Sequence, residues 1–296
     1  MSMIVSSQPS DLRLGARVFG PHDFALMAII NRTPDSFYDS GTTFDLGAAL
    51  NRLDEAVTQG ADIVDVGGVK AGYGPDVDAE EELRRTADFV AEARSRYPDI
   101  VISVDTWRSE VADELCKLGA DLINDTWAGH DAELVAVAAQ HGVGLVCSHS
   151  GGLGPRTDPH RSAYDDVVAD VIATTARLAE RAVHGGVRPD GILIDPTHDF
   201  GKNTRQSLEL TRRLDELVAT GWPVLVALSN KDFIGETLDR DTFERLPGTL
   251  AATAISAHLG ARVFRAHNVA ESRQVLDMVA SILGHRQPTV ARRGLA

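Results

Sequence analysis

Short apolar runs without alternation recur along this chain, and each of them stops at a polar residue. The run from Ile100 to Val104 is rich in β-branched residues and ends at Asp105. Continuous apolar runs of this length are typical of strands buried on both faces, as in parallel sheets covered by helices. An unpaired charge in the middle of such a strand is very costly. We therefore expect the Asp105 carboxylate at the tip of its strand, where a ligand or a partner group can meet it.

The same pattern occurs eight times, which predicts an α/β chain folded as a single-domain (β/α)8 TIM barrel. Ligands bind at the carboxyl ends of the strands in this fold. A doubly wound open sheet is the alternative, and it is less favoured because open sheets seldom collect polar tips from every strand. The run from Ile63 to Gly68 carries Asp65 and ends in a pair of glycines. The polar groups that end or follow the other seven runs are Asn31, Asp105, Asn124, His149, Asp195, Ser229 with Lys231, and Arg265 with His267.

Three segments divide the chain around this barrel. We expect residues 1–19 to be an N-terminal extension, residues 20–284 to form the barrel and residues 285–296 to be a flexible C-terminal tail. Within the extension, residues 12–19 are predicted to form a small hairpin that plugs the barrel floor.

Composition excludes several classes of function. The 296 residues suit one barrel of about 250 residues with extensions, and the formal net charge of −14 argues against binding to nucleic acid or to an anionic membrane surface. Cys116 and Cys147 fall in a predicted helix and a predicted strand, so we expect buried free thiols and no disulfide. With no apolar stretch near about 18 residues and no signal-like start, we expect a cytoplasmic protein.

The polar residues at the ends of four predicted strands indicate a binding site for a heterocyclic ring. Asp105, Asn124, Asp195 and Lys231 offer paired acceptors, a carboxamide and a cation that converge inside a barrel. Such a set suits a flat ring with an amino-amide edge, such as a pterin or guanine. The alternative is that each residue caps a strand or forms a buried ion pair, but four matching tips favour binding.

A second group predicts a phosphate site. Asn31 and the pair Arg265 and His267 follow the first and last strands, which are neighbours in a closed barrel. Arginine supplies a fork for phosphate oxygens, and the Asn31 oxygen suits Mg²⁺, a cation that pairs with substrate phosphates. The alternative is that Arg265 binds backbone and that His267 is buried and neutral.

The stretch Asn31-Arg32-Thr33-Pro34-Asp35-Ser36-Phe37 resembles the first signature loop of the dihydropteroate synthases. Those enzymes join a dihydropterin pyrophosphate to p-aminobenzoate in folate biosynthesis. The resemblance covers roughly residues 20–283. Its other motifs are Asp65-Val66-Gly67-Gly68, Ser103-Val104-Asp105-Thr106, Ile123-Asn124-Asp125, Asp195-Pro196, Phe200-Gly201-Lys202, Ser229 with Lys231, and Arg265-Ala266-His267.

This resemblance implies a TIM barrel, a homodimer, Mg²⁺ as cofactor and a role for each tip. The pterin would be held by Asp105, Asn124, Asp195 and Lys231. The pyrophosphate would be held by Asn31, Arg265 and His267, with Mg²⁺ at Asn31. The catalytic residues would be Asp35, which helps to hold the pterin cation, and Lys231.

The chain also departs from the family pattern, mainly on the acceptor side. After Gly67-Gly68 the family reads Glu-Ser-Thr-Arg-Pro-Gly, whereas this chain reads Val69-Lys70-Ala71-Gly72-Tyr73-Gly74. The degenerate acceptor-binding positions are Lys70, Ala71, Gly72, Ser229 and Asn230, the last standing where the family has Arg. Other departures are Arg32 for Val, Ser148 for Met, and Thr197 and Asp199 for two glycines.

We interpret the sequence as a dihydropteroate synthase homologue with weak or no such activity, which keeps a site for a pterin-like or sulfone-like ligand. The alternative is an active transferase for p-aminobenzoate or a related acceptor, with Lys70, Tyr73 or Arg32 replacing the lost groups. A pterin-dependent methyltransferase is less favoured, since that class usually lacks the features around Phe200 and Ser229.

Overall fold

A computed structural model describes residues 11–33, 44–72, 74–157 and 163–294. Within these ranges, eight parallel strands form a nearly closed barrel in the order β8-β7-β6-β5-β4-β3-β10-β9, which confirms the predicted fold. A bridge between Ile194 and Val224 brings the edge strands together, and the Ile194 N–H donates to the Pro223 carbonyl at 3.0 Å. The strands are β3 (Ala25–Asn31), β4 (Ile63–Gly67), β5 (Val101–Asp105), β6 (Leu122–Asp125), β7 (Gly144–Ser148), β8 (Ile192–Asp195), β9 (Leu225–Ala227) and β10 (Val263–Ala266).

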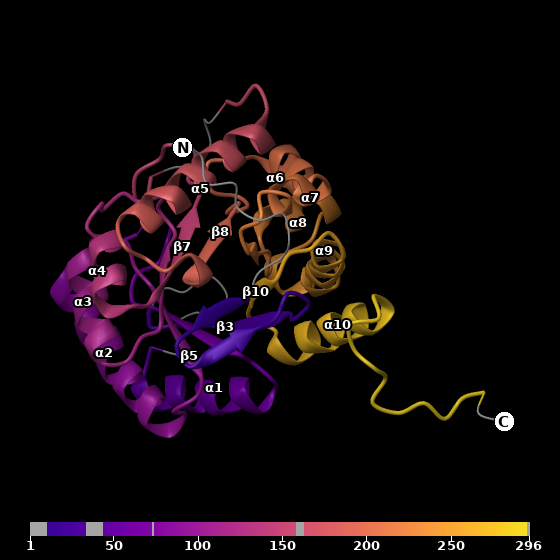
Figure 1. The fold of residues 1–296 in the computed structure, drawn as a ribbon, viewed down its shortest axis with the longest axis horizontal. Coiled ribbons are helices and arrows are strands. Elements are labelled where there is room, and N and C mark those ends of the chain that lie inside the picture. Colours follow the sequence, from indigo (N-terminus) through magenta and orange to yellow (C-terminus); the bar gives the residue numbers. More distant parts are fainter. Residues whose placement is uncertain (1–10, 34–43, 73, 158–162, 295–296) are drawn as a thin grey trace.

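Helices surround the barrel and cover the outer face of the strands (Figure 1). In the described part of the chain none is long and apolar enough to cross a membrane. The helices are α1 (Leu46–Thr58), α2 (Ala79–Arg96), α3 (Ser109–Lys117), α4 (Leu134–His141), α5 (Val167–His184), α6 (Thr204–Arg212), α7 (Leu214–Val218), α8 (Asp232–Leu238), α9 (Leu246–His258) and α10 (Val269–Ile282), with single 3₁₀ turns at Pro189–Gly191 and Thr242–Glu244.

Helices α1, α2 and α6 begin where the sequence supplies capping side chains. Asp45 accepts the Ala48 N–H at the start of α1, and Asp78 accepts the Glu81 N–H at the start of α2. A capping box of Asn203 and Gln206 opens α6. These contacts satisfy backbone donors that have no partner within the helix.

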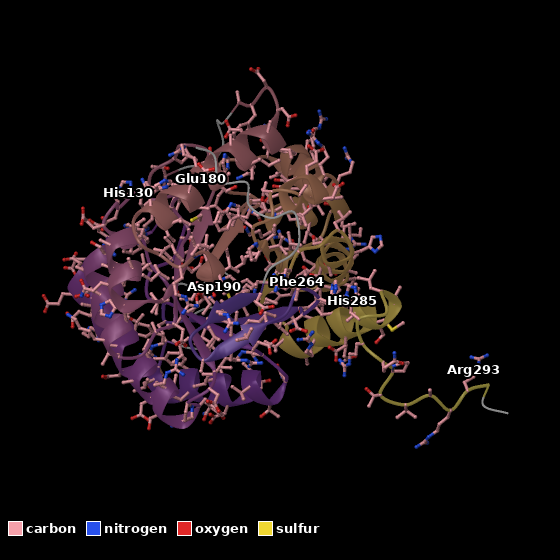
Figure 2. All side chains as sticks on the ribbon, viewed as in Figure 1. His130, Glu180, Asp190, Phe264, His285 and Arg293 are labelled. Atoms are coloured by element: carbon pink, nitrogen blue, oxygen red, sulfur yellow. The ribbon has the colours of Figure 1, made fainter. Side chains whose placement is uncertain are left out.

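Two apolar cores lie on the two faces of the sheet, and side chains fill the space between strands and helices (Figure 2). The hairpin of β1 (Leu12–Leu14) and β2 (Arg17–Phe19) belongs to the inner core, where Leu12 and Leu14 are fully buried. A Cβ on Gly144 at the start of β7 would stand 2.6 Å from the Leu14 side chain. The hairpin therefore plugs the barrel floor, as predicted. Beyond α10 the chain runs away from the barrel (Figure 1).

Candidate functional site

The inward positions near the carboxyl ends of the strands are polar. On β5 the inner-core residue Val101 is followed at two-residue spacing by Ser103 and Asp105, so all three point to the barrel interior. A cavity of about 340 Å³ lies at this end. The described residues on its wall include Asn31, Thr33, Val69, Lys70, Ala71, Gly72, Asp105, Trp127, Leu153, Asp199, Phe200, Ser229, Lys231, Arg265 and His267.

Arg265 is the centre of an ion-pair cluster in the cavity floor. Its Nε donates to Asp65 Oδ2 at 2.6 Å, and its Nη2 donates to Asp105 Oδ2 at 2.9 Å. Burial alone would lower the pKa of the guanidinium, but Asp65 and Asp105 together raise it. The alternative that Arg265 bonds to backbone is therefore not what the structure shows.

Asp65 is a site residue to which the sequence motif assigned no role. It lies in the middle of β4, within the apolar run from Ile63 to Gly68, and is fully buried. Its charge is compensated by Arg265, by the Ser103 hydroxyl at 2.6 Å and by the Asn124 amide at 3.2 Å. The sequence could have indicated this role, because two-residue alternation in β4 places Asp65 on the same inward face as Gly67.

Asp105 shares this cluster and accepts the Thr126 hydroxyl at 2.9 Å. Burial, opposed by Arg265 and reinforced by Asp65, raises its pKa from 3.8 to about 7. The acid form of Asp105, which can donate a hydrogen bond at the cavity wall, is therefore easier to reach than in an ordinary exposed carboxyl group.

Asp105→Asn should reveal this shift in the pH dependence of stability. A raised pKa means that the stability contributed by Asp105 is complete below about pH 3.8 and is lost as the pH rises through about 7. The variant cannot ionise at this position, so it escapes this loss. The free energy of unfolding of the variant minus that of the wild type should therefore increase by roughly 3–4 kcal/mol from pH 4 to pH 8. Urea unfolding of both proteins across this range measures the difference, and parallel curves would contradict the raised pKa.

Lys231 reaches the cavity, but the loop after β8 engages it. Its ammonium donates to the His198 carbonyl and stands 5.1 Å from the centre of the Phe200 ring. Burial lowers its pKa, with Asp199 and Asp195 opposing. Lys231 is thus placed at the cavity wall beside Asp105 and Arg265.

Two predicted pterin residues lie behind the cavity wall. Asn124 and Asp195 are each 4% exposed, and neither is among the described residues that line the cavity. Asn124 donates to Asp65, and Asp195 accepts the Thr197 N–H at 2.7 Å. The structure therefore brings together Asp105 and Lys231 from this group but sets the other two deeper.

The predicted pyrophosphate residues all line the cavity, from β3 and β10 and the loops that follow them. The His267 ring nitrogen Nδ1 lies 3.0 Å from the Ser229 hydroxyl. Burial, Arg265 and Arg52 lower the pKa of His267 to about 3. Its ring is neutral at pH 7 and offers a hydrogen bond, whereas Arg265 carries the positive charge.

The degenerate acceptor positions divide into two sets. Lys70, Ala71, Gly72 and Ser229 line the cavity. Asn230 does not, because its side chain faces Thr249 and Asn268 and is 1% exposed.

Two further predicted residues do not reach this part of the site. The Arg32 guanidinium donates to the carbonyls of Arg85 and Phe44 beside the helices, so it does not replace the missing acceptor groups. Asp35 lies outside the described residues.

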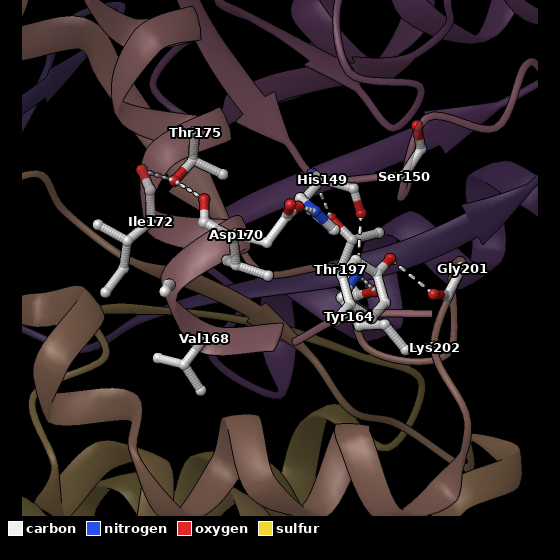
Figure 3. A network of polar contacts seen from close by, with 12 residues as sticks. His149, Ser150, Tyr164, Val168, Asp170, Ile172, Thr175, Thr197, Gly201 and Lys202 are labelled. Atoms are coloured by element: carbon white, nitrogen blue, oxygen red, sulfur yellow. Dashed lines mark hydrogen bonds and ion pairs between the residues drawn. The ribbon is translucent and has the colours of Figure 1, made fainter. Parts of the chain in front are cut away.

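In the loop after β8, two residues that replace family glycines adopt the positive φ values that glycine favours. Thr197 and Asp199 have φ values of 51° and 70°, in the left-handed region that side chains disfavour. Lys202 holds the loop by donating to the carbonyls of His149, Thr197 and Phe200 at 2.8–3.1 Å (Figure 3). Burial lowers its pKa to about 7. The loop is therefore fastened in a fixed position over β8.

The comparisons agree with this geometry. The family described as "Pterin binding enzyme" matches residues 27–267. This chain belongs to that family. A relative from Mycobacterium leprae, named "Inactive dihydropteroate synthase 2", is 58% identical over 92% of this chain and 94% of its own length. A dihydropteroate synthase from Synechocystis is 37% identical over 93% of this chain and 96% of its own length.

Solved structures of the pterin-binding family match the fold closely. The Yersinia pestis dihydropteroate synthase, crystallised with a sulfonamide drug, superposes with a TM-score of 0.88 at 30% identity, over 93% of this chain and all of the other. The chain is therefore a dihydropteroate synthase homologue, as the motifs on its strand tips indicated.

Proposed function

We propose that this homologue has weak or no dihydropteroate synthase activity and keeps a site for a pterin-type or sulfone-like small molecule. The observation that carries the proposal is the composition of one cavity wall. Asp105, Lys231 and Arg265 remain on it, while Ala71 and Gly72 stand where the family loop has Thr and Arg. The name of the Mycobacterium leprae relative, which includes the word "inactive", supports the same reading.

Without the Thr and Arg of the family loop, the acceptor substrate would not be held in position for the reaction. An Arg beside an arylamine carboxylate supplies a paired, charge-assisted contact, and neither Ala71 nor Gly72 can replace it. Orientation of the second reactant provides much of the barrier reduction in such a reaction. A protein that binds the first substrate but leaves the acceptor unheld would turn over slowly.

Magnesium fits this site only as an ion shared with a substrate. Among the described residues no group of three His, Cys, Asp or Glu side chains could hold a metal ion. The Asn31 amide lines the cavity on the side of Arg265 and His267 and offers one oxygen. Mg²⁺ that keeps several waters and binds substrate phosphates needs few protein ligands, and it would neutralise the leaving pyrophosphate.

Lys70 favours a second candidate, an active transferase for p-aminobenzoate or a related acceptor. It lines the cavity next to Ala71 and Gly72 and carries a positive charge. As a point charge it would attract a carboxylate without the two parallel hydrogen bonds of an Arg fork.

Calorimetry with the two substrates distinguishes these functions. We expect dihydropterin pyrophosphate to bind with Mg²⁺ and to bind at least tenfold more weakly without it, because pyrophosphate charge then remains uncompensated. In the presence of pyrophosphate and Mg²⁺, p-aminobenzoate should give no binding at concentrations that saturate the Synechocystis enzyme. Lys70→Met is the control, and acceptor binding that this variant abolishes would show that Lys70 holds the acceptor, which favours the transferase.

We further propose that the chain is a homodimer that associates through α9 and α10. These helices pack side by side, and they expose Ile255, Met278 and Ile282 to 52%, 60% and 69%. Exposed apolar side chains on two helices that pack against each other are typical of an interface.

The double substitution Met278→Glu with Ile282→Glu should convert this dimer to a monomer. Each new carboxylate would be buried at the interface without a partner. Sedimentation velocity measures the change, with Leu118→Glu as the control on a distant helix end. A monomeric wild type would exclude the dimer, and a variant that stays dimeric would move the interface elsewhere.

A cytoplasmic location is also part of this proposal. It is supported by the two buried free thiols of Cys116 and Cys147, which suit a reducing compartment.

A further inference from the structure

A side chain from the loop after β7 contacts the acceptor loop, residues 69–77, which carries the degenerate positions Lys70, Ala71 and Gly72. The Arg156 guanidinium donates from Nε to the Gly72 carbonyl at 3.2 Å and from Nη1 to the Pro75 carbonyl at 2.7 Å. A planar guanidinium presents several donors in one fork, so a single side chain can fix two points of a loop. We refer to these two hydrogen bonds as the Arg156 clamp.

The clamp joins loops that belong to distant strands of the barrel. In the sheet, β5 and β6 lie between β4, which precedes the acceptor loop, and β7, which precedes Arg156. Leu153 and Thr157 from one loop and Ala71 and Gly72 from the other line the same cavity. Arg156 itself is not among the described residues on the cavity wall. The clamp therefore connects two parts of this wall without being part of it.

The loop after β7 is a firm anchor for the clamp. Within it, the Ser150 hydroxyl donates to the Leu153 carbonyl at 3.0 Å, and the Thr157 hydroxyl donates to the Gly154 carbonyl at 2.7 Å. A Cβ on Gly201 would stand 2.6 Å from the Ser150 carbonyl oxygen. This loop therefore packs closely against the loop after β8, where Figure 3 shows the two residues.

The acceptor loop has little else to hold it. Among its described residues, one other hydrogen bond is present, in which the Val77 carbonyl accepts Arg108 Nη2 at 2.6 Å. Val77 lies at the end of the loop, just before α2. The middle of the acceptor loop therefore depends on the Arg156 clamp for its position.

Arg156 makes this contact from a strained backbone. Its φ is 61°, in the left-handed region that glycine adopts readily and other residues seldom do. Such conformations persist where the surrounding structure maintains them, and they are found at functional positions. A glycine would suit the local backbone better, so the side chain must supply what the backbone does not require. The two hydrogen bonds to the acceptor loop are that contribution.

We propose that Arg156 is a positioning residue that holds the acceptor loop against the loop after β7 and slows the exchange of ligands at the cavity. This inference rests on the proposed small-molecule site and adds a restraint on loop motion to the loss of the acceptor groups. A ligand cannot pass between the two loops while the clamp joins them. The acceptor loop likewise cannot move toward a bound acceptor without breaking both hydrogen bonds, so exchange depends on local opening.

Arg156→Gly should release the acceptor loop without weakening the fold. Amide hydrogen exchange in peptides that cover residues 69–77 should become at least about fivefold faster, because two hydrogen bonds are lost. The free energy of unfolding should stay the same or rise slightly, since glycine relieves the strain at this φ. Arg156→Lys keeps the charge but not the fork, so its exchange should be intermediate.

Arg188→Gly is the matched control for this measurement. It removes an arginine from the turn before β8, at the opposite end of the barrel, where the guanidinium pairs with Asp190 in an exposed position. Hydrogen exchange in the acceptor loop should not change in this variant.

The same variants should change ligand kinetics more than affinity. Stopped-flow tryptophan fluorescence, to which Trp127 in the cavity wall contributes, follows the binding of dihydropterin pyrophosphate with Mg²⁺. In Arg156→Gly the association and dissociation rate constants should both rise at least about fivefold, with a Kd within about twofold of the wild type, because Arg156 does not line the cavity. A merely structural role would lower stability or affinity and would not raise both rates together.

Unchanged hydrogen exchange in the acceptor loop of folded Arg156→Gly would overturn the proposal. Rate constants equal to those of the wild type, with substrate bound by both proteins, would overturn it as well. If the substrate binds to neither protein, the proposed ligand site fails, and hydrogen exchange still decides whether Arg156 holds the loop. The two failures are therefore distinguishable.

Discussion

Arg265→Met is expected to destabilise the fold by about 3–5 kcal/mol, the cost of leaving buried charges without a partner. Its guanidinium is the cation between Asp65 and Asp105 in the floor of the cavity. Without it, the fully buried Asp65 carboxylate would keep only its contacts with Ser103 and Asn124. Urea unfolding at pH 7 measures the loss.

A second substitution distinguishes the loss of charge compensation from the loss of packing as the cause of the destabilisation by Arg265→Met. Asp65→Asn in the Arg265→Met protein should restore part of the stability, because it removes the uncompensated charge. Arg213→Met is the control on the surface, where the guanidinium pairs with Asp166, Glu209 and Glu216 and solvent screens the charges, so the expected cost is small. An Arg265→Met protein as stable as this control would contradict a buried ion-pair cluster.

Restoring the acceptor loop is expected to raise dihydropteroate synthesis at least tenfold above the wild type. The change is Ala71→Thr with Gly72→Arg, the residues that the family loop has at these positions. A Cβ on Gly72 meets only the end of the Lys70 side chain, at 3.8 Å, so the first atom of a new side chain has room. A charge-assisted contact to the acceptor carboxylate is worth about 1.5–3 kcal/mol, which corresponds to a factor of ten or more.

The control for this restoration is Gly154→Arg. It adds the same charge in the loop after β7, where nothing lies within 4 Å of a Cβ. An equal gain from this variant would mean that charge near the site is enough. A lack of gain from the loop variant, with pterin binding retained, would show that the loop is not what limits the reaction.

The strands and their inward tips were predictable because the physics that places them is local. A continuous apolar run indicates a buried strand, and two-residue alternation then decides which side chain faces the interior. Asp105, Arg265 and His267 follow directly from that rule, and the structure brings them to one cavity.

The remaining features depend on contacts between distant segments. Arg265 and Asp65 are 200 residues apart, so no local pattern relates this mid-strand carboxylate to the cation that pairs with it. The contact between Trp127 and Phe200 likewise joins two loops that the sequence does not relate. Asn230 stands at a motif position, yet its backbone φ of 57° and its bonds to Thr249 direct it away from the cavity.

The most direct test of the central claim is the steady-state rate with dihydropterin pyrophosphate, Mg²⁺ and p-aminobenzoate, set beside the Synechocystis enzyme under the same conditions. We predict a kcat/KM at least ~1,000-fold lower for this chain, equivalent to about 4 kcal/mol of lost transition-state stabilisation. A value within tenfold of the Synechocystis enzyme would contradict the account, because the groups at Ala71 and Gly72 would then be dispensable.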